Sequence, residues 1–557
     1  MSLTFMNILA INYGVHDASA CILQNGEVKS YYKEERLTGT KRDTNPKLAI
    51  KSCIEDFNGT LDYAVLISYP DAEPYFKLTS KLSNIEPKKI IDYSYKHHLS
   101  HASLAFYNSG FENSIVIVVD GQGSLFADNL AESETVYLAS YPNHFECLIK
   151  NFSTNTEHSF FNIKEKFEDH LVPHSNFEYH VNSGDGGIVN VYNSASVLIS
   201  QGVLENGKTM GLSSYGSSSS YEKIFNEKSQ PDWNLFTNDN CHYRVFKGHE
   251  NKVIRNVTSR NYQFYADYAY AIQTQTQEAV GNLIEKSISK CDCTNVCVVG
   301  GYGMNIVANH YYTQRFPNLN FYFEPNADDG GLSIGAANLL YHNLTKDTAI
   351  RPITTTSFHG KNYDVSSYQE KTATIQEIAK LLYENKSVAV FTGLSEAGQR
   401  ALGNRSILFN ALNPDAKEIV NKIKNREWYR PFAAIVLEED ASQYFEMGDI
   451  ISCPYMTISF PVKTDIIPGV THIDNTCRIQ TVSKSDKYLY NLLIEFKKLS
   501  GHGIILNTSF NLAGDPLVET PEDAFRTLYN SCLDYLWFEE TQQLFKNTHK
   551  PLSFNYS

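Results

Sequence analysis

Residues 96–123 read KHHLSHASLAFYNSGFENSIVIVVDGQG, which predicts a helix, then a strand, then a glycine-rich turn. Residues four apart lie on one face of a helix, so His97 and His101 would lie side by side at a spacing that suits one shared divalent ion. The apolar run at residues 115–119 predicts a buried strand. That strand ends at Asp120, whose turn could bring backbone N–H groups close to a phosphate.

A second acid followed by glycine strengthens this pattern. Residues 324–331 read EPNADDGG, and a helix of small residues is predicted at residues 332–337. A histidine pair at this spacing is more often structural than metal-binding when it occurs alone. Two histidines together with two aspartates, however, form a ligand set suited to iron, manganese or zinc.

Several short segments then follow one another in a specific order. They are HHLSHA at residues 97–102, DG at 120–121, GKTMGL at 207–212, DGG and GAA within 329–337, and SEAGQRALGNRSIL at 395–408. In this order the chain resembles, over nearly its whole length, the O-carbamoyltransferases of antibiotic and nodulation-factor tailoring. The resemblance implies a mixed α/β fold: an actin-like ATPase (ASKHA, TsaD-like) domain at residues 1–350, a linker at 351–370 and a YrdC-like α/β domain at 371–557.

Bulk properties narrow the class of protein. The chain has 557 residues, of which 42% are hydrophobic and 20% charged, as in ordinary soluble globular proteins. A net charge of −14 opposes general binding to a polyanion. Ten cysteines without paired CxxC spacing favour neither a disulfide scaffold nor a structural zinc site. The cysteine usage favours reduced thiols in a cytoplasmic location. Because no apolar run of about 18 residues is present, we expect no membrane partner.

Local patterns predict further elements. Residues 7–12 predict a first strand, and Asn25-Gly26 predicts a two-residue hairpin turn because this pair tolerates positive φ angles. A long amphipathic helix is predicted at residues 264–290. Residues 140–260 show no regular pattern, and their role cannot be read from it.

The resemblance implies a metal centre and a nucleotide site in the first domain. The metal ligands would be His97, His101, Asp120 and Asp329, with Asp329 preferred to Asp328, and the metal would be iron(II). The nucleotide, ATP with Mg²⁺, would be bound by Gly121, Gly300, Gly301, Asn305, Gly331 and Arg400.

The resemblance implies two further residues as candidates for catalysis. His16 would act as a general base or orient the acceptor, since a neutral imidazole is suited to taking a hydroxyl proton. A polar turn that caps the hairpin is an equally good interpretation of this residue. Lys41 would reach the nucleotide, the alternative being a solvated charged segment.

In the second domain the resemblance implies a carbamoyl phosphate site made of Lys424, Arg430, Arg478, Asn507 and Ser509. Forked guanidinium donors, a lysine charge and short neutral donors suit a phosphate dianion with a planar carbamoyl head. Carbamoyl phosphate and ATP would give carbamoyl adenylate there. The first domain would then transfer the carbamoyl group to a hydroxyl.

The acceptor stays open. A small-molecule hydroxyl is the first choice, and a hydroxymethylated pyrimidine in a nucleotide or in DNA is the alternative. A tRNA threonylcarbamoyladenosine enzyme and a hydrogenase-maturation carbamoyltransferase share both folds, but the second of these carries zinc fingers that this sequence lacks. A non-catalytic nucleotide-binding scaffold is the remaining alternative, and a homodimer is the default expectation.

Overall fold

The computed structural model describes residues 6–13, 16–68, 89–126, 130–154, 177–183, 186–200, 204–217, 222–238, 244–247, 257, 261–351 and 357–549. The chain forms two compact units. The first comprises Met1–Glu34 and Arg42–Thr356, and the second comprises Glu35–Lys41 and Ser357–Ser557. The continuous ranges predicted from the sequence did not anticipate that residues 35–41 group with the second unit. Residues 352–356 of the predicted linker lie outside the described residues.

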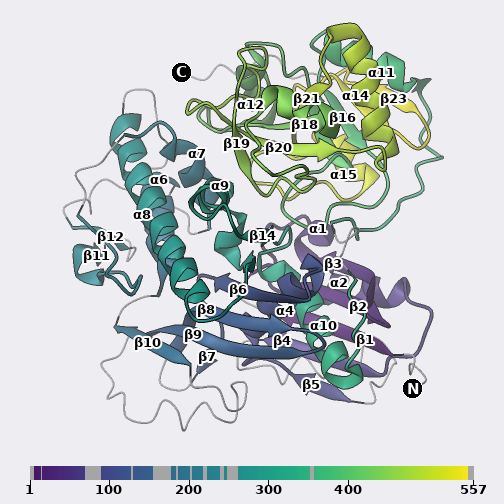
Figure 1. The fold of residues 1–557 in the computed structure, drawn as a ribbon. Helices are drawn as coiled ribbons and strands as arrows, with labels where there is room; N and C mark the ends of the chain where they lie inside the picture. Colours follow the sequence, from purple (N-terminus) through teal and green to yellow (C-terminus); the bar gives the residue numbers. More distant parts are fainter. Residues whose placement is uncertain are drawn as a thin grey trace. The chain divides into compact units, whose positions relative to one another are not determined.

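The first unit begins with a five-stranded sheet of order β3-β2-β1-β4-β5 (Figure 1). Its strands are β1 (Asn7–Tyr13), β2 (Ser19–Gln24), β3 (Glu27–Lys33), β4 (Tyr63–Ser68) and β5 (Ile90–Asp92). Strands β1, β2 and β3 run antiparallel, whereas β4 and β5 are parallel to β1. The predicted hairpin is confirmed, with positive φ angles of 52° at Asn25 and 82° at Gly26.

The second sheet repeats this plan. Its order is β10-β9-β8-β6-β13-β14, with β6, β8 and β9 antiparallel and β13 and β14 parallel to β6. These strands are β6 (Asn113–Val119), β8 (Leu130–Ser140), β9 (His144–Thr154), β10 (Glu178–Ser183), β13 (Asn295–Val299) and β14 (Asn320–Phe323), and the short β7 (Leu125–Phe126) pairs with β8. An antiparallel meander followed by two parallel strands therefore occurs twice. The predicted mixed α/β, actin-like architecture is confirmed.

Helices α4 (His97–Ser109) and α10 (Leu332–Thr345) join the two sheets of this unit. Helix α10 packs on β1, β2 and β4, while α4 packs on β6 and β13 and against α10. The core between them includes Ala105 and Val118 beside Ala336. As predicted, α4 ends at a glycine, Gly110, in the left-handed conformation.

Helix α10 approaches α4 most closely at Gly335. A Cβ at Gly335 would lie 2.0 Å from the Ser100 carbonyl oxygen, which belongs to α4 backbone and cannot rotate away. We expect Gly335→Ala to lower the free energy of unfolding of the first unit by about 2–3 kcal/mol, because the helices must separate. Chemical denaturation checks this, with Leu344→Ala on an exposed position of α10 as the control that changes little. Equal midpoints for both variants would contradict the close packing.

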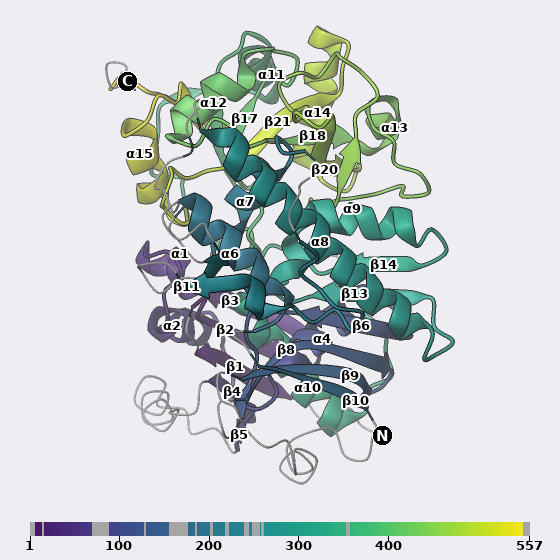
Figure 2. The ribbon, with the colours of Figure 1, turned by 90° about the vertical axis from the view of Figure 1, so that its left-hand side faces the viewer.

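A layer of helices covers the second sheet on its other side (Figures 1 and 2). It contains α6 (Ile188–Ser200), α7 (Asn206–Ser213) and α8 (Tyr262–Ile288), with α9 (Ile306–Arg315) against α8. The long predicted helix corresponds to α8. The absence of regular pattern at residues 140–260 was misleading, since β9, β10, α6 and α7 lie there. Helix α6 is largely buried, between the sheet and α8, and its polar side consists of Asn and Ser with no charged residue.

Two further described features of the first unit are short: α2 (Lys47–Glu55) on the hairpin strands, and the pair β11 (Phe236–Asn238) and β12 (Arg244–Phe246). Helix α1 (Glu34–Thr38) begins at the last residue of the first unit's opening segment, and its residues 35–38 group with the second unit. No helix within the described part of the chain is both long and apolar enough to span a bilayer.

The second unit is built on a nine-stranded mixed sheet of order β15-β23-β22-β16-β17-β21-β18-β20-β19. Its strands are β15 (Lys371–Thr372), β16 (Val388–Phe391), β17 (Arg405–Phe409), β18 (Ala433–Leu437), β19 (Ser459–Pro461), β20 (Thr476–Val482), β21 (Ile504–Ser509), β22 (Tyr535–Phe538) and β23 (Gln543–Lys546). Its helices are α11 (Ile375–Tyr383), α12 (Ala416–Lys424), α13 (Ala441–Tyr444), α14 (Lys487–Ser500) and α15 (Pro521–Tyr529).

Both faces of this sheet are covered. Val388 and Val390 of β16 join the core beneath α11 and α14, whereas Ala389 and Phe391 join the core beneath α15. This alternation is the period of two expected of a strand, and with both faces buried β16 reads as a continuous apolar run. Figure 2 shows α11 and α14 beside the central strands.

Candidate active sites

In the first unit, polar side chains collect where parallel strands end. His16 follows β1, Asp120 follows β6, and Asp329 lies in the loop between β14 and α10. Ligands in open α/β sheets bind outside the carboxyl ends of the strands, so this placement is where a site is expected. His97 and His101 enter from the first two turns of α4.

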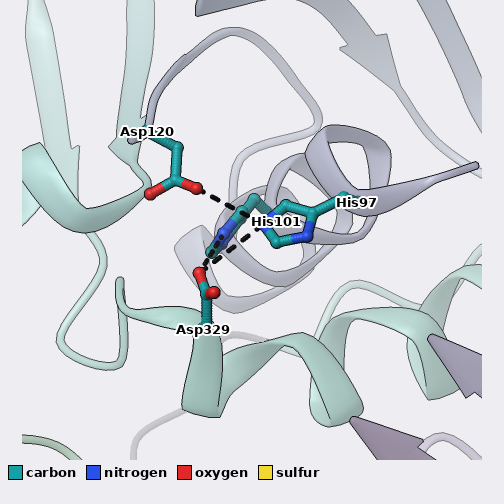
Figure 3. Close-up of side chains that lie close together, drawn as sticks. All are labelled: His97, His101, Asp120 and Asp329. Carbon is teal, nitrogen blue, oxygen red and sulfur yellow. Dashed lines mark ion pairs between the residues drawn. The ribbon is translucent and has the colours of Figure 1, made fainter. Parts of the chain in front are cut away.

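Four of the predicted residues meet at one point (Figure 3). His97 Nε2 lies 3.4 Å from Asp120 Oδ2 and 3.5 Å from Asp329 Oδ1, and His101 Nε2 lies 3.4 Å from the same Asp329 oxygen. One ligand atom from each residue lies within 4.8 Å of all the others. Two imidazole nitrogens and two carboxylate oxygens therefore converge on a volume the size of one ion.

The chemistry of this cluster fits a metal. The Nε2 atoms of His97 and His101 are buried, and neither makes a hydrogen bond to any residue that the structure describes. A buried polar atom without a partner is costly, and a bound cation would satisfy both nitrogens. Burial opposes the charged imidazole of His97, but the carboxylates of Asp329 and Asp120 outweigh it and raise the pKa of His97 to about 10. The same negative field attracts a divalent cation.

His16 lies at the edge of the cluster. Its Nδ1 is 2.8 Å from Asp17 Oδ2, and its Nε2 is 3.8 Å from Asp329 Oδ2. Burial lowers the pKa of His16, but the carboxylates of Asp329, Asp17 and Asp120 together raise it to about 9. Asp17 thereby sets the orientation of the ring, and Nε2 is the atom directed toward the metal ligands.

The two adjacent aspartates have different partners. Asp329 lies with the histidines, whereas Asp328 Oδ2 accepts a 2.6 Å hydrogen bond from Lys33 Nζ. Lys33 is buried at the end of β3, and its Nζ also lies 3.9 Å from Asp17 Oδ1. Sequence reasoning missed Lys33. The available signal was a lysine directly after the two buried tyrosines of β3.

The glycines assigned to nucleotide binding serve close packing. At Gly300, φ is 88° and a Cβ would lie 2.4 Å from the Val119 carbonyl oxygen. Only glycine therefore brings the next residue close enough for Gly301 N to donate to Asp120 Oδ1 at 2.9 Å. A Cβ at Gly331 would lie 2.2 Å from the Asn326 carbonyl oxygen. A nucleotide-binding role for them stays a prediction.

Three other predicted residues of this site have distinct positions. Asn305 caps α9, its Oδ1 accepting from Ala308 N, and its Nδ2 donates to buried Gln273. Gly121 directly follows Asp120, with room for a Cβ. Lys41 is exposed and lies in the segment that groups with the second unit, so its predicted role stays a prediction.

In the second unit, strand register brings the predicted anion-binding residues to one face. Ala433 of β18 pairs with Asn507 on one side and with Arg478 on the other. Residues directly opposed in a sheet point to the same face, so Asn507 and Arg478 share a face, with Cα atoms roughly 10 Å apart across two strand spacings. Ser509, two residues after Asn507, points the same way.

Lys424 closes one side of this face. Its Nζ, on the last residue of α12, donates to the Asn511 Oδ1 and carbonyl oxygens at 2.8 Å and lies 3.3 Å from Ser509 Oγ. On the other side, Asn507 Nδ2 donates to the Ala401 carbonyl oxygen at 2.9 Å, next to Arg400. The structure therefore gathers Lys424, Asn507 and Ser509 as the sequence predicted.

A cluster of guanidinium groups surrounds this face. Burial, followed by repulsion from neighbouring arginines, holds the pKa of Arg400 and of Arg426 well below the ordinary value, and burial lowers that of Arg478 to about 10. Arg430 repels all three and has Glu427 3.6 Å away. Such crowding of half-buried like charges is unfavourable without an anion. Sequence reasoning missed Arg426, although it lies between Lys424 and Arg430.

The most specific segment of the chain, residues 395–408, is largely structural. Glu396 Oε1 accepts hydrogen bonds from the backbone N–H groups of Leu402, Asn404 and Arg405. The buried Arg405 guanidinium donates to the Thr392 and Gly393 carbonyl oxygens and stacks on the Phe391 ring, 3.6 Å from its centroid. This turn holds Arg400 and Ala401 beside Asn507.

Comparisons with known sequences cover most of the chain. The profile described as carbamoyltransferase N-terminus matches residues 73–338, and the profile described as carbamoyltransferase C-terminus matches residues 379–543. Nodulation protein NolNO of Sinorhizobium fredii is 27% identical over 94% of this chain and 78% of its own length. An uncharacterized protein of Synechocystis is 27% identical over 96% of both chains.

A shorter match is closer in sequence. Nodulation protein U of Rhizobium tropici is 36% identical over 40% of this chain and 39% of its own length. Among solved structures, full-length HypF in a phosphate- and nucleotide-bound form is 15% identical, with a TM-score of 0.36 over 61% of this chain and 46% of that chain. From the two profiles, the chain belongs to the carbamoyltransferase family and is an enzyme that transfers carbamoyl groups.

Proposed function

We propose that this protein is an ATP-dependent O-carbamoyltransferase that uses two sites. The observation that carries the proposal is that the first unit holds a four-residue set of potential metal ligands and the second unit holds a guanidinium cluster. The two clusters suit different ligands, a cation and a polyanion. A scaffold that only binds a nucleotide has no need of both.

The guanidinium cluster supports an activating step. Carbamoyl phosphate is hydrolysed to carbamate and inorganic phosphate, and a carbamate oxygen attacks the α-phosphorus of ATP with release of pyrophosphate. Arg400, Arg430 and Arg478 would neutralise the phosphates, while Lys424 and the Asn507 amide would position the carbamoyl head. The buried Oδ1 of Asn507 makes no hydrogen bond within the described residues, which leaves an acceptor for the carbamoyl NH₂. The product is carbamoyl adenylate.

The metal cluster supports the transfer step. The acceptor oxygen attacks the carbamoyl carbon and the bond to the AMP phosphate breaks. His16, oriented by Asp17, would take the hydroxyl proton at Nε2 once a cation in the cluster offsets the carboxylates that raise its pKa. His97, His101, Asp120 and Asp329 would hold a divalent metal, with iron(II) the expected one because imidazole-rich ligation suits it better than Mg²⁺. When bound, this metal supplies Lewis-acid stabilisation of charge on the leaving phosphate.

The acceptor proposed first is a small-molecule hydroxyl. The net charge of −14 disfavours a long polyanionic acceptor, which places hydroxymethylated DNA second and tRNA third. A free hydroxymethylated nucleotide stays a reasonable acceptor because it lacks the polyanionic backbone.

Product analysis tests the proposal. The purified protein is incubated with ATP, Mg²⁺, carbamoyl phosphate, iron(II) and a panel of aminoglycoside, cephem, nucleoside and hydroxymethylated DNA acceptors. We expect one acceptor to gain a single carbamoyl group while AMP and pyrophosphate are released, as measured by mass spectrometry. His101→Ala should lose carbamoyl transfer and keep acceptor-independent release of pyrophosphate. Failure to form AMP with any acceptor would rule out the adenylate route.

A further inference from the structure

Helix α4, which carries His97 and His101, has no cap within its own sequence. Its N-cap residue is Lys96, which makes no side-chain capping hydrogen bond. The first N–H groups of a helix need acceptors when they are buried. Here His97 N donates to Ser124 Oγ at 3.1 Å, and His98 N lies 3.5 Å from Glu132 Oε2. The start of α4 is therefore capped from another part of the chain.

The same two residues also hold the loop that presents Asp120. Ser124 N donates to Glu132 Oε2 at 2.9 Å, and Gly123 N donates to the Glu132 carbonyl oxygen at 2.9 Å. Ser124 lies four residues after Asp120, and its Oγ also donates to the Ser94 carbonyl oxygen. The Glu132 carboxylate therefore links helix α4, which carries His97 and His101, to the loop that follows Asp120.

The Glu132 carboxylate is built into the interior. It is 1% exposed and is paired with Lys150 of β9, which is also 1% exposed. Burial raises the pKa of Glu132, but Lys150 and His98 outweigh it and lower that pKa to about 2. A Cβ at Gly123 would lie 2.7 Å from Glu132 Oε2 and 2.5 Å from His98 Cδ2, so a side chain there would displace the carboxylate.

We propose that Glu132 and Ser124 are positioning residues for the metal centre, holding α4 and the Asp120 loop in the one arrangement that brings His97, His101 and Asp120 onto a single ion. This inference rests on the proposed function, since it requires that the cluster bind a metal. Groups that orient metal ligands typically change affinity 10- to 100-fold when removed. Lys150 acts through Glu132 by neutralising its buried charge.

Strand β8 supplies a matched control. Glu134, two residues after Glu132, is 2% exposed and accepts from Ile188 N at 2.7 Å, at the start of α6. It also accepts from Asn151 Nδ2 and Ser133 Oγ. Helix α6 carries none of the four metal ligands. Glu134 therefore shares the strand, the burial and the capping role of Glu132, but caps a different helix.

Cobalt(II) titration of the full-length chain tests the proposal, because the visible absorption of bound Co²⁺ reports both affinity and ligand geometry. We expect Glu132→Gln to weaken Co²⁺ binding about 10-fold or more and to change the absorption bands. Ser124→Ala should weaken it in the same direction by a smaller factor. Glu134→Gln should bind Co²⁺ within about twofold of wild type with unchanged bands, even where its thermal stability falls.

A double variant separates positioning from stability. Glu132→Gln with Lys150→Met removes the lysine charge that the single variant leaves unpaired, so we expect stability to recover while Co²⁺ affinity stays low. Recovery of affinity together with stability would overturn the positioning role, as would wild-type Co²⁺ binding by a folded Glu132→Gln. If the wild-type chain itself binds no Co²⁺, the metal centre fails and this inference fails with it.

Discussion

Replacing Asp329 with asparagine is expected to lower carbamoyl transfer about 10³-fold, because the variant loses the one carboxylate that both histidines face. Asparagine keeps the shape of the side chain and removes its charge. The remaining ligands, His97, His101 and Asp120, would then carry only one negative charge with which to bind the cation. The measurement is the rate of carbamoylated product formation, combined with the Co²⁺ affinity of the same preparation.

The control is Asp347→Asn. Asp329 lies just before helix α10 and Asp347 lies just after it. Asp347 accepts from Tyr341 and pairs with Arg351, away from the metal ligands. We expect this variant to keep wild-type Co²⁺ affinity. The assignment of Asp329 as a ligand would be wrong if Asp329→Asn bound Co²⁺ as tightly as Asp347→Asn.

The second large effect is expected at Arg478. Arg478→Gln should lower carbamoyl phosphate-dependent release of AMP about 100-fold, because a half-buried guanidinium that pairs with a phosphate is worth roughly 2–5 kcal/mol. The thermal stability of Arg478→Gln should not fall together with its activity. Removing one of several crowded cations relieves repulsion with Arg400 and Arg430, so the temperature of thermal unfolding without ligand should not fall.

Two measurements and one control separate these effects. Arg526 is an exposed arginine of α15 paired with Asp523 at 2.7 Å, and Arg526→Gln should leave AMP release unchanged. Inorganic phosphate should raise the unfolding temperature of wild type more than that of Arg478→Gln. A variant that unfolds at lower temperature but releases AMP normally would show that Arg478 is structural.

The guanidinium cluster also shows that two arginines of one sequence motif can occupy different environments in the structure. Arg400 and Arg405 lie in one motif and look equivalent in sequence. In the structure Arg405 is fully buried against Phe391 and backbone carbonyl oxygens, whereas Arg400 lies with Arg430 and Arg478. Arg426 was not predicted as a site residue, although it lies in the segment that contains Lys424 and Arg430. Which arginine joins the cluster depends on tertiary packing, and no local pattern records that.

The sequence by itself determined the local features of both units. The spacing of His97 and His101, the strand ending at Asp120, the Asn25-Gly26 turn and the long helix α8 all follow from periodicity and turn chemistry, which act over a few residues. The resemblance selected Asp329 over Asp328, and the structure places Asp329 beside the histidines. Family motifs added the fold and the list of site residues.

Only the tertiary structure decided which distant residues contact one another. Lys33 meets Asp328 across 295 residues, and Glu132 caps a helix that begins 35 residues earlier. The register of β18 brings Arg478 and Asn507 to one face of the sheet. Helix α6 escaped prediction because it is largely buried and carries no charged residue. Such contacts depend on strand order and on charge pairing in the interior, which are properties of the assembled chain and leave no periodic trace in the sequence.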